Sequence, residues 1–236
     1  MNSKDVIIPL DFKDRQTTLD FLKIFPDDLK PFVKIGMELF YSEGPDIVRI
    51  IRGMNHDVFL DLKLHDIPNT VKGAMRSIAH LDVKITNIHA STTDMMKAAL
   101  EGLVEAEDKN RPLIVAVTQL TSTSSSALKE ELLIEHSMED TVGIYAKRAY
   151  EAGLDGVVCS PLEVETVRKY CGKPFITVTP GIRYIDSTVK DDQSRTTTPK
   201  DAARLGCDYI VVGRPITRAD DPVAAYLKIK DEFIKE

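Results

Sequence analysis

Short runs rich in valine and isoleucine recur along this chain, and an amphipathic stretch separates each run from the next. Parallel strands that are buried on both faces read as continuous apolar runs, and helices make the connections between them. The alternation therefore predicts repeated βα units around a parallel sheet. We count eight predicted strands: Val6–Asp11, Phe32–Ile35, Val58–Lys63, Ile85–Ala90, Leu113–Thr118, Gly156–Cys159, Phe175–Thr179 and Tyr209–Val212.

The stretches between these runs carry helical patterns and helix-end signals. Thr198 followed by Pro199 is typical of an N-cap with proline at the first helical position, and Gly206 is typical of a helix stop. Ser160 followed by Pro161 repeats the start signal. The predicted helices are Pro45–Arg52, Thr70–Ala79, Asp94–Glu105, Asp140–Ala152, Pro161–Lys169, Pro199–Leu205 and Pro222–Ile234.

Eight strand–helix pairs favour an α/β fold with a single (β/α)₈ barrel, or TIM barrel, over a doubly wound open sheet with the same linear pattern. The 236 residues suit one barrel, and no linker or low-complexity tract divides them, so we expect one domain over residues 1–236. Two connections are longer than a barrel needs. We expect a short surface helix over Ala127–Ile134 within Ser122–Glu139, and a mobile loop over Ile182–Thr198.

Charge and hydropathy argue against nucleic-acid and membrane partners. The net charge is −6, and no block of lysine or arginine forms the basic stripe of a nucleic-acid or anionic-membrane binder. The first apolar run, Val6–Leu10, is too short for a signal peptide, and no segment approaches the length of a membrane span. We therefore expect a cytoplasmic protein.

Cysteines, histidines and glycines show none of the common metal or cofactor motifs. Cys159, Cys171 and Cys207 are odd in number and widely spaced, which predicts reduced, mostly buried thiols. The histidines lack metal-ligand spacing, and His65 is interpreted as a structural hydrogen-bonding residue. No glycine-rich dinucleotide or triphosphate motif occurs. These patterns signal neither a histidine-bound metal nor a dinucleotide or triphosphate site.

Charged residues stand where the first three predicted strands end. Asp11 ends the first, Lys34 lies in the second, and the third leads into Asp61, Lys63 and Asp66. The active site of a (β/α)₈ barrel lies at the C-terminal ends of its strands. Residues two apart on a strand share a face, so Asp61 and Lys63 should be neighbours.

A carboxylate about 4 Å away stabilises an ammonium group by up to about 4 kcal/mol at an effective dielectric of about 20. We therefore expect Lys63 to keep its proton and to be able to donate it. The DxK pattern alone is equally typical of a structural ion pair at a strand end. Five charged residues at predicted strand ends together favour catalysis.

A second cluster follows the last two strands and combines glycine with arginine. Residues 179–183 read TPGIR and residues 212–215 read VGRP. Barrels often bind phosphate after strands seven and eight. Glycine lets backbone N–H groups approach an anion, and arginine matches phosphate oxygens in a forked geometry. The pair of motifs predicts a phosphorylated substrate.

The run DLKLHDIPNTV at residues 61–71 closely resembles the signature of orotidine 5′-phosphate decarboxylases, and of their bacterial branch in particular. Further matching segments occur in the family order: PLDF with Asp11, VKIG with Lys34, VTQLTS with Thr121, TPGIR with Arg183, DDQSR with Gln193 and VVGRPI with Arg214. The resemblance implies a cofactor-free and metal-free lyase that converts orotidine 5′-monophosphate into UMP and CO₂. This is the last step of de novo pyrimidine nucleotide biosynthesis.

The resemblance also implies roles for single residues. Lys63 is the proton donor, Asp61 and Lys34 complete an alternating charge array, and Asp66 reaches into the neighbouring subunit's site. The implied substrate contacts are Asp11 and Lys34 on the ribose, Thr121 on the pyrimidine, Thr70 on the ribose across the dimer, and Arg183, Gln193, Gly213 and Arg214 on the phosphate and its closing loop. The implied assembly is a homodimer with shared active sites.

The chain departs from the family pattern just after Arg183. Tyr184 and Asp186 stand where the family commonly has proline and glycine. The recognition residues remain, but the stiffness and the closing rate of this loop are expected to differ.

Two alternatives remain open at this point. A Mg²⁺-dependent sugar-phosphate decarboxylase or aldolase, such as 3-keto-gulonate 6-phosphate decarboxylase or hexulose-phosphate synthase, shares the DxKxxD core; the HDIPNT continuation and the Gln193 loop favour the pyrimidine substrate, and EDTA separates the two activities. A non-catalytic phosphate-ligand sensor would bind UMP without turning over orotidine monophosphate, and it has little reason to flank Lys63 with Asp61 and Asp66.

Overall fold

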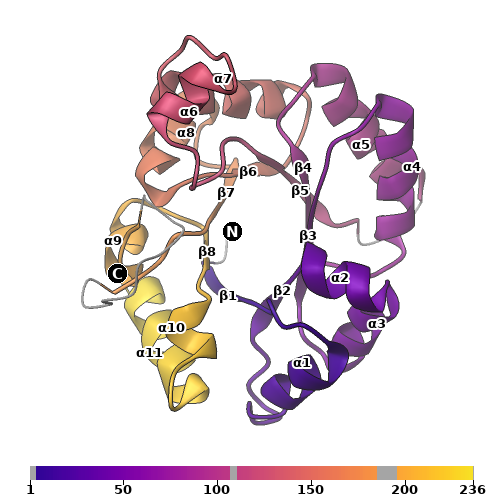
Figure 1. The fold of residues 1–236 in the computed structure, drawn as a ribbon, viewed down its shortest axis with the longest axis vertical. Helices are drawn as coiled ribbons and strands as arrows, with labels where there is room; N and C mark the ends of the chain where they lie inside the picture. The colour runs from indigo at the N-terminus through magenta and orange to yellow at the C-terminus, as the bar shows by residue number, and fades with distance from the viewer. Residues whose placement is uncertain (1–3, 107–110, 185–195, 236) are drawn as a thin grey trace.

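Eight parallel strands pair in chain order, and β8 pairs with β1, so the sheet closes into a barrel (Figure 1). The structure is a computed structural model that describes residues 4–106, 111–184 and 196–235. The predicted (β/α)₈ barrel is confirmed. The strands are β1 (Asp5–Pro9), β2 (Phe32–Gly36), β3 (Val58–Leu64), β4 (Ile85–His89), β5 (Leu113–Val117), β6 (Gly156–Val158), β7 (Ile176–Thr179) and β8 (Tyr209–Val211).

The helices surround the barrel (Figure 1). They are α1 (Arg15–Leu22), α2 (Met37–Glu43), α3 (Asp46–Gly53), α4 (Pro68–Ala79), α5 (Thr93–Glu105), α6 (Ser125–Glu130), α7 (Met138–Glu151), the 3₁₀ turn η1 (Pro161–Glu163), α8 (Val164–Cys171), α9 (Pro199–Arg204), α10 (Arg214–Thr217) and α11 (Pro222–Ile234). The seven predicted helices are confirmed, with η1 and α8 together forming one of them. The surface helix predicted over Ala127–Ile134 exists as α6, which begins and ends earlier. The sequence patterns do not predict α1, α2 and α10.

The predicted helix caps are also confirmed. The Thr198 hydroxyl accepts a hydrogen bond from the Asp201 N–H at 3.1 Å, and Pro199 opens α9. Ser160 forms a capping box with Glu163 at the start of η1. Gly206 ends α9 with a φ of 81°, a left-handed conformation that costs glycine least.

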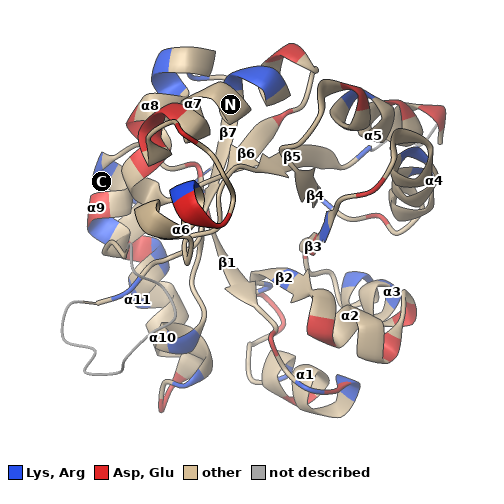
Figure 2. Cartoon of the chain, turned by 45° about the horizontal axis from the view of Figure 1, so that its top comes forward, with Lys and Arg blue, Asp and Glu red and all other residues tan. Residues whose placement is uncertain are grey.

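The core has two layers, because the strands bury both of their faces. Inside the barrel, side chains from every second position pack on one another, among them Ile7, Phe59 and Val115. Their neighbours along β1, Val6 and Ile8, face outward and pack beneath the helices. Figure 2 shows that charged residues lie mainly on the helices and loops, whereas the strands are largely uncharged.

The prediction that the cysteines are mostly buried is confirmed. All three cysteines are buried, and burial raises the pKa of Cys171 and of Cys207 to about 11. The α4 and α5 helices pack closely at Gly102, where an added Cβ would lie 2.2 Å from the Lys72 carbonyl oxygen. None of the described helices is both long enough and apolar enough to cross a membrane.

A buried ion pair ties the last strands together at the N-terminal end of the barrel. Asp208, just before β8, accepts hydrogen bonds from the Thr177 N–H at 2.8 Å and from the Arg168 guanidinium at 2.6 Å. The Arg168 and Asp208 side chains are 19% and 12% exposed. Removing Asp208 leaves the partly buried guanidinium of Arg168 without this counter-charge.

Asp208→Ala is therefore expected to destabilise the fold by about 3 kcal/mol, which for a chain of this size lowers Tm by about 10 °C. Thermal unfolding followed by circular dichroism measures the change. The matched control is Asp20→Ala, because Asp20 pairs with Lys23 on the surface, where solvent screens the attraction and the pair contributes little. Equal losses in the two variants would contradict the structural role of Asp208.

Candidate active site

A cavity of about 710 Å³ lies at the C-terminal ends of the strands. This volume is within the usual range for small-molecule sites. Eight of the eleven residues predicted for the site line the cavity: Asp11, Lys34, Asp61, Lys63, Thr121, Arg183, Gly213 and Arg214. The barrel topology brings them together, since parallel strands deliver their C-terminal ends to one face.

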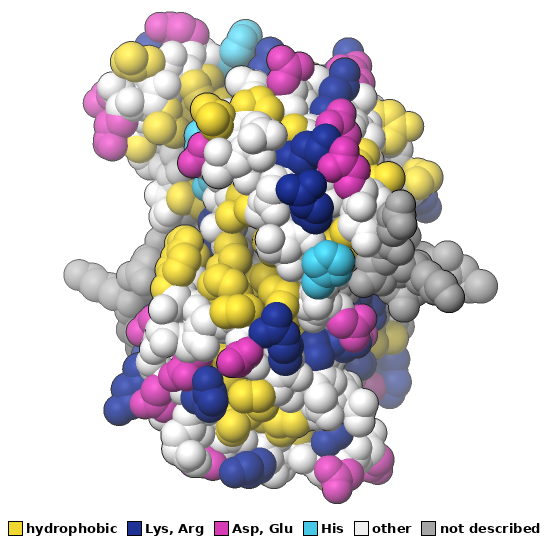
Figure 3. Space-filling model, turned by 90° about the vertical axis from the view of Figure 1, so that its right-hand side faces the viewer, with side chains coloured by type: hydrophobic (Ala, Val, Ile, Leu, Met, Phe, Trp, Pro, Cys, Tyr) yellow, Lys and Arg dark blue, Asp and Glu magenta, His cyan; other side chains and the backbone are white. Residues whose placement is uncertain are grey.

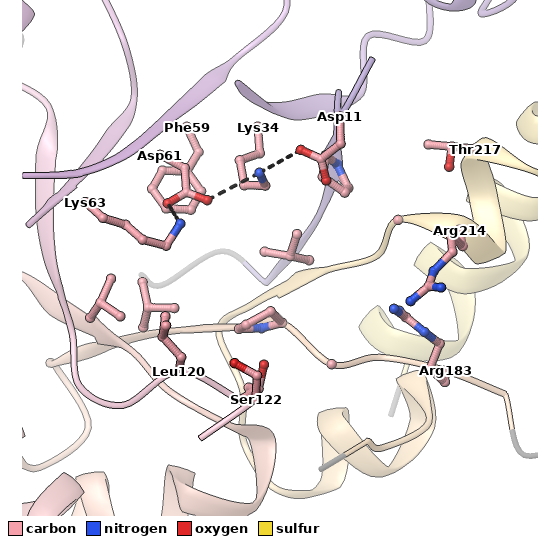
Figure 4. A pocket seen from close by; sticks show the side chains of 18 of the residues that line it. Asp11, Lys34, Phe59, Asp61, Lys63, Leu120, Ser122, Arg183, Arg214 and Thr217 are labelled. Atoms are coloured by element: carbon pink, nitrogen blue, oxygen red, sulfur yellow. Dashed lines mark hydrogen bonds and ion pairs between the residues drawn. The ribbon is translucent and has the colours of Figure 1, made fainter. Parts of the chain in front are cut away.

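One side of the cavity carries a row of alternating charges (Figure 4). The Lys63 Nζ lies 2.6 Å from the Asp61 Oδ1, and the Lys34 Nζ lies 3.3 Å from the Asp61 Oδ2. The same Lys34 Nζ donates to the Asp11 Oδ1 at 3.1 Å. Lys34 thus bridges two carboxylates, and Asp61 bridges two ammonium groups.

Lys34 and Asp61, in the middle of this row, are held in their ionised forms by their neighbours. Burial by itself lowers the pKa of Lys34, but the carboxylates of Asp61 and Asp11 outweigh burial and raise that pKa overall. Burial raises the pKa of Asp61, and the ammonium groups of Lys34 and Lys63 reverse this and lower it overall. The buried pair of Lys34 and Asp61 therefore stays charged because each group lies beside groups of opposite charge.

Gly36 leaves space for the row. An added Cβ at Gly36 would lie 3.0 Å from the Lys34 Nζ and 3.2 Å from the Asp11 Oδ1. A side chain at the end of β2 would therefore push the Lys34–Asp11 pair apart. Glycine also starts α2 here, directly after the strand and without a side-chain cap, which explains why the helix gives no start signal in the sequence.

Asp61 and Lys63 are neighbours, as predicted, but regular strand alternation does not bring them together. β3 pairs with β4 at Leu60 and again at Leu64, and the register shifts between these two positions. Lys63 lies within the shift and has a φ of 51°, which is uncommon for a residue with a side chain. Such irregularities in strands are frequent beside active sites, where they redirect a side chain.

Asn87 on β4 belongs to this region and was not predicted. Its side chain is buried and contacts both Asp61 and Lys63. The signal in the sequence is an amide in the middle of β4, between Ile85 and Ile88, since a buried polar side chain needs partners. The sequence does not reveal which partners it has.

The opposite side of the cavity is cationic. Arg183, after β7, and Arg214, at the start of α10, direct their guanidinium groups toward one another (Figure 4). Partial burial, followed by the positive charges of Arg183 and Arg218, lowers the pKa of Arg214. Arg218 also lines the cavity, and it was not predicted. Cations held this close favour an anion between them.

Backbone contacts shape this cationic side. An added Cβ at Gly213 would lie 3.1 Å from the Pro9 Cγ, so a side chain there would require the Pro9 ring to shift slightly. The Arg183 N–H donates to the Thr197 carbonyl at 2.9 Å, and the Thr197 N–H donates to the Gly181 carbonyl at 3.0 Å. These bonds hold together the two ends of the long connection after β7.

Two of the predicted site residues that the structure describes, Asp66 and Thr70, do not line the cavity. Asp66 follows β3 and Thr70 lies in the first turn of α4, and both are exposed on the surface. Gln193 lies outside the described residues, as do Asp186 and the central part of the predicted mobile loop. Nearby, the ring of His65 lies 3.0 Å from the Ser91 hydroxyl, in keeping with a hydrogen-bonding role.

The arrangement therefore has two ends with different chemistry. The arginine end suits a phosphate group, and the end with Asp61 and Lys63 can place a proton donor beside a reacting atom. Among the described residues, no group of three or more histidine, cysteine, aspartate or glutamate side chains is arranged to hold a metal ion.

Comparison with known sequences identifies relatives along nearly the whole chain. Residues 4–229 match the profile of the family described as Orotidine 5'-phosphate decarboxylase / HUMPS family. Proteins named orotidine 5'-phosphate decarboxylase from Bacillus cereus (strain AH820) and Bacillus anthracis (strain CDC 684 / NRRL 3495) are each 53% identical over 234 residues. Each alignment covers 98% of this chain and 98% of the relative.

Solved structures agree in fold over the same length. The crystal structure of orotidine 5'-phosphate decarboxylase from Lactobacillus acidophilus superposes with a TM-score of 0.88 at 40% identity, covering 98% of this chain and 99% of the other. An uncharacterized conserved protein from Geobacillus kaustophilus gives a TM-score of 0.86 at 44% identity, covering 97% of this chain and 99% of the other.

Proposed function

Since this chain belongs to the orotidine 5'-phosphate decarboxylase / HUMPS family, we propose that it acts as an orotidine 5′-phosphate decarboxylase and converts orotidine 5′-monophosphate into UMP and CO₂. The observation that carries this proposal is the row of alternating charges across the cavity from an arginine pair. Such a site can bind a phosphate at one end and donate a proton to the substrate at the other.

The chemical step breaks the bond between C6 of the pyrimidine and the carboxylate carbon. CO₂ leaves without the bonding electron pair, which remains on C6 as a carbanion. The Lys63 ammonium, fixed 2.6 Å from Asp61, stabilises this charge and then transfers its proton to C6. The proton balances the lost carboxylate, and UMP is the product.

Asp61 has two functions in this proposal. Its carboxylate fixes the direction of the Lys63 ammonium, and it stands close to the place of the departing carboxylate. Repulsion between these two groups is relieved as CO₂ leaves. Lys34 neutralises part of the Asp61 charge and, with Asp11, binds the ribose hydroxyls. Thr121, which is 9% exposed, contacts the pyrimidine.

Ultraviolet absorbance gives a direct test of the proposed reaction. Purified protein in excess EDTA should decrease the absorbance of orotidine monophosphate as UMP forms. The family description also covers the HUMPS branch, and the main alternative from the sequence is a Mg²⁺-dependent sugar-phosphate enzyme. Turnover of a sugar phosphate that requires Mg²⁺, with none of orotidine monophosphate, would contradict the proposal.

Arg214→Ala is expected to weaken binding of orotidine monophosphate by about 100-fold, because a charge-assisted, bidentate contact to the phosphate is lost. The phosphate-free nucleoside orotidine should lose little, since it lacks the dianion. Values of kcat/KM for the two substrates measure the difference, and each substrate serves as the control for the other. Equal losses would assign Arg214 a structural role.

We further propose that the enzyme is a homodimer with shared active sites. Asp66 and Thr70 are exposed and lie outside the cavity of their own subunit, as residues that serve a partner should. Beside them, Ile67 is 67% exposed, and on α2 Tyr41 is 71% exposed. Figure 3 shows hydrophobic side chains gathered in the centre of the face that carries α2 to α5. Exposed apolar patches of this kind are typical of protein interfaces.

Two broader expectations form part of the same proposal. Buried free thiols suit a reducing compartment, which supports a cytoplasmic location. The chain is proposed to work as one domain over residues 1–236, since β1 and β8 lie side by side and close one barrel. The proposed partners are a small nucleotide and a second copy of the chain.

A further inference from the structure

Asn87 connects the two residues that carry the proposed chemistry. Its side-chain amide donates to the Asp61 Oδ1 at 2.7 Å, and its side-chain oxygen accepts the Lys63 backbone N–H at 2.8 Å. Asn87 is 1% exposed, so water does not compete for these bonds. One buried side chain thus contacts a carboxylate and a backbone group that are two residues apart.

The partners fix the orientation of the amide. An ionised carboxylate can only accept hydrogen bonds, and a backbone N–H can only donate one. The amide nitrogen of Asn87 must therefore face Asp61, and its oxygen must face Lys63. The reverse orientation would set donor against donor and acceptor against acceptor in a buried place, which is costly.

The bond to Lys63 replaces a missing backbone contact. β3 and β4 pair at Leu60 and again at Leu64, and the ladder is interrupted between these positions. The Lys63 N–H lies in this interruption and donates to the side chain of Asn87. Lys63 also has the left-handed φ of 51°, a conformation that persists only where the surroundings enforce it.

We propose that Asn87 is a positioning residue for the decarboxylation, which fixes the Asp61 carboxylate and the irregular backbone at Lys63 so that the Lys63 ammonium points at the reacting carbon. The inference rests on the proposed function. Asn87 does not line the cavity and acts only through Asp61 and Lys63. It belongs with the chemistry and not with phosphate binding, since the arginine end of the cavity is built by other strands.

Asn87→Ala removes both hydrogen bonds. We expect kcat to fall by about 100-fold, as is typical when a reacting group is displaced by about 1 Å. The KM for orotidine monophosphate and the Kd for UMP should change by less than about threefold, because the phosphate and ribose contacts remain. The matched control is Thr86→Val, which removes a buried hydroxyl on the same strand that donates to the Leu60 carbonyl. The control should retain kcat.

Asn87→Asp provides the sharper test, because protonation turns the new side chain back into a mimic of asparagine. When it is ionised, the introduced carboxylate keeps an acceptor for the Lys63 N–H but repels Asp61. This repulsion raises the pKa of the carboxyl pair. Once the pair holds one proton, the introduced group again donates toward Asp61 and accepts from Lys63. The ratio of the variant's kcat to that of the wild type should therefore rise as the pH is lowered.

The outcomes separate the possibilities. A ratio that rises toward acid pH for Asn87→Asp, and stays flat for Asn87→Ala, supports the positioning role. The Asn87→Asp measurement stands even if Asn87→Ala fails to fold. A flat ratio for Asn87→Asp would overturn the positioning role. The role would also be overturned if Asn87→Ala changed kcat and UMP affinity only as much as Thr86→Val does. Absence of turnover by the wild-type chain would instead overturn the proposed function.

Discussion

Replacing Lys63 with alanine should abolish nearly all turnover of orotidine monophosphate while leaving the fold intact. The change removes the cation nearest Asp61 and, in the proposed mechanism, also the proton donor. Positioned proton transfer contributes about 10² to 10⁴ in rate, and electrostatic stabilisation of a developing charge contributes about 10² to 10³. We expect kcat to fall by at least about 10⁴-fold.

The affinity for UMP distinguishes loss of chemistry from loss of the site. UMP lacks the carboxylate and keeps the ribose and phosphate, so its Kd in Lys63→Ala should stay close to the wild-type value. Lys13→Ala is a suitable control, because that side chain is 81% exposed and pairs only with Asp14 at 3.8 Å among the described residues. Near-wild-type turnover by Lys63→Ala would refute its role as the acid.

The second large effect is recovery of activity on mixing two inactive chains. If Asp66 serves the partner's site, Lys63→Ala and Asp66→Ala should complement one another. In the hybrid dimer, the site on the Asp66→Ala chain has its own Lys63 and borrows Asp66 from the partner. The other site lacks both groups. Each hybrid therefore regains one site.

Random exchange in a twofold dimer makes about half of the dimers hybrids, so activity should return to about a quarter of wild type. The measurement is turnover after the two variants are unfolded together and co-refolded. The unmixed variants, treated in the same way, are the controls. Activity no higher than theirs would mean that Asp66 acts within its own chain, since every site in the mixture would then lack one group.

The strands could be predicted from the sequence because each one is buried on both faces and therefore appears as a local run of apolar residues. β1 illustrates this: Val6, Ile7 and Ile8 are all completely buried, so the strand reads as an uninterrupted apolar run. The ends of the strands shifted by at most two residues, and Asp11 lies just beyond β1. α9 after Thr198 was equally visible from its cap, whereas α1 was missed although Asp14 caps it.

Features that depend on contacts between distant residues could not be predicted. α2 begins at Met37 directly after β2, and its N-cap Gly36 has no side chain that could signal the start. The register shift in β3 cannot be recognised from the residues around Lys63. It depends on Asn87 of the next strand, whose side chain accepts the hydrogen bond from the Lys63 N–H. Sequence reasoning thus placed the charged residues at the site but missed the side chain between them.

The two ends of the cavity are held at a fixed distance from one another. The arginine end is attached to β7 and β8 and the Asp61–Lys63 end to β3, so the closed barrel fixes their separation (Figure 4). A ligand benefits from both ends only if its phosphate and its reacting carbon are the right length apart. The fixed separation therefore lets the barrel select a ligand by its length as well as by its chemical groups.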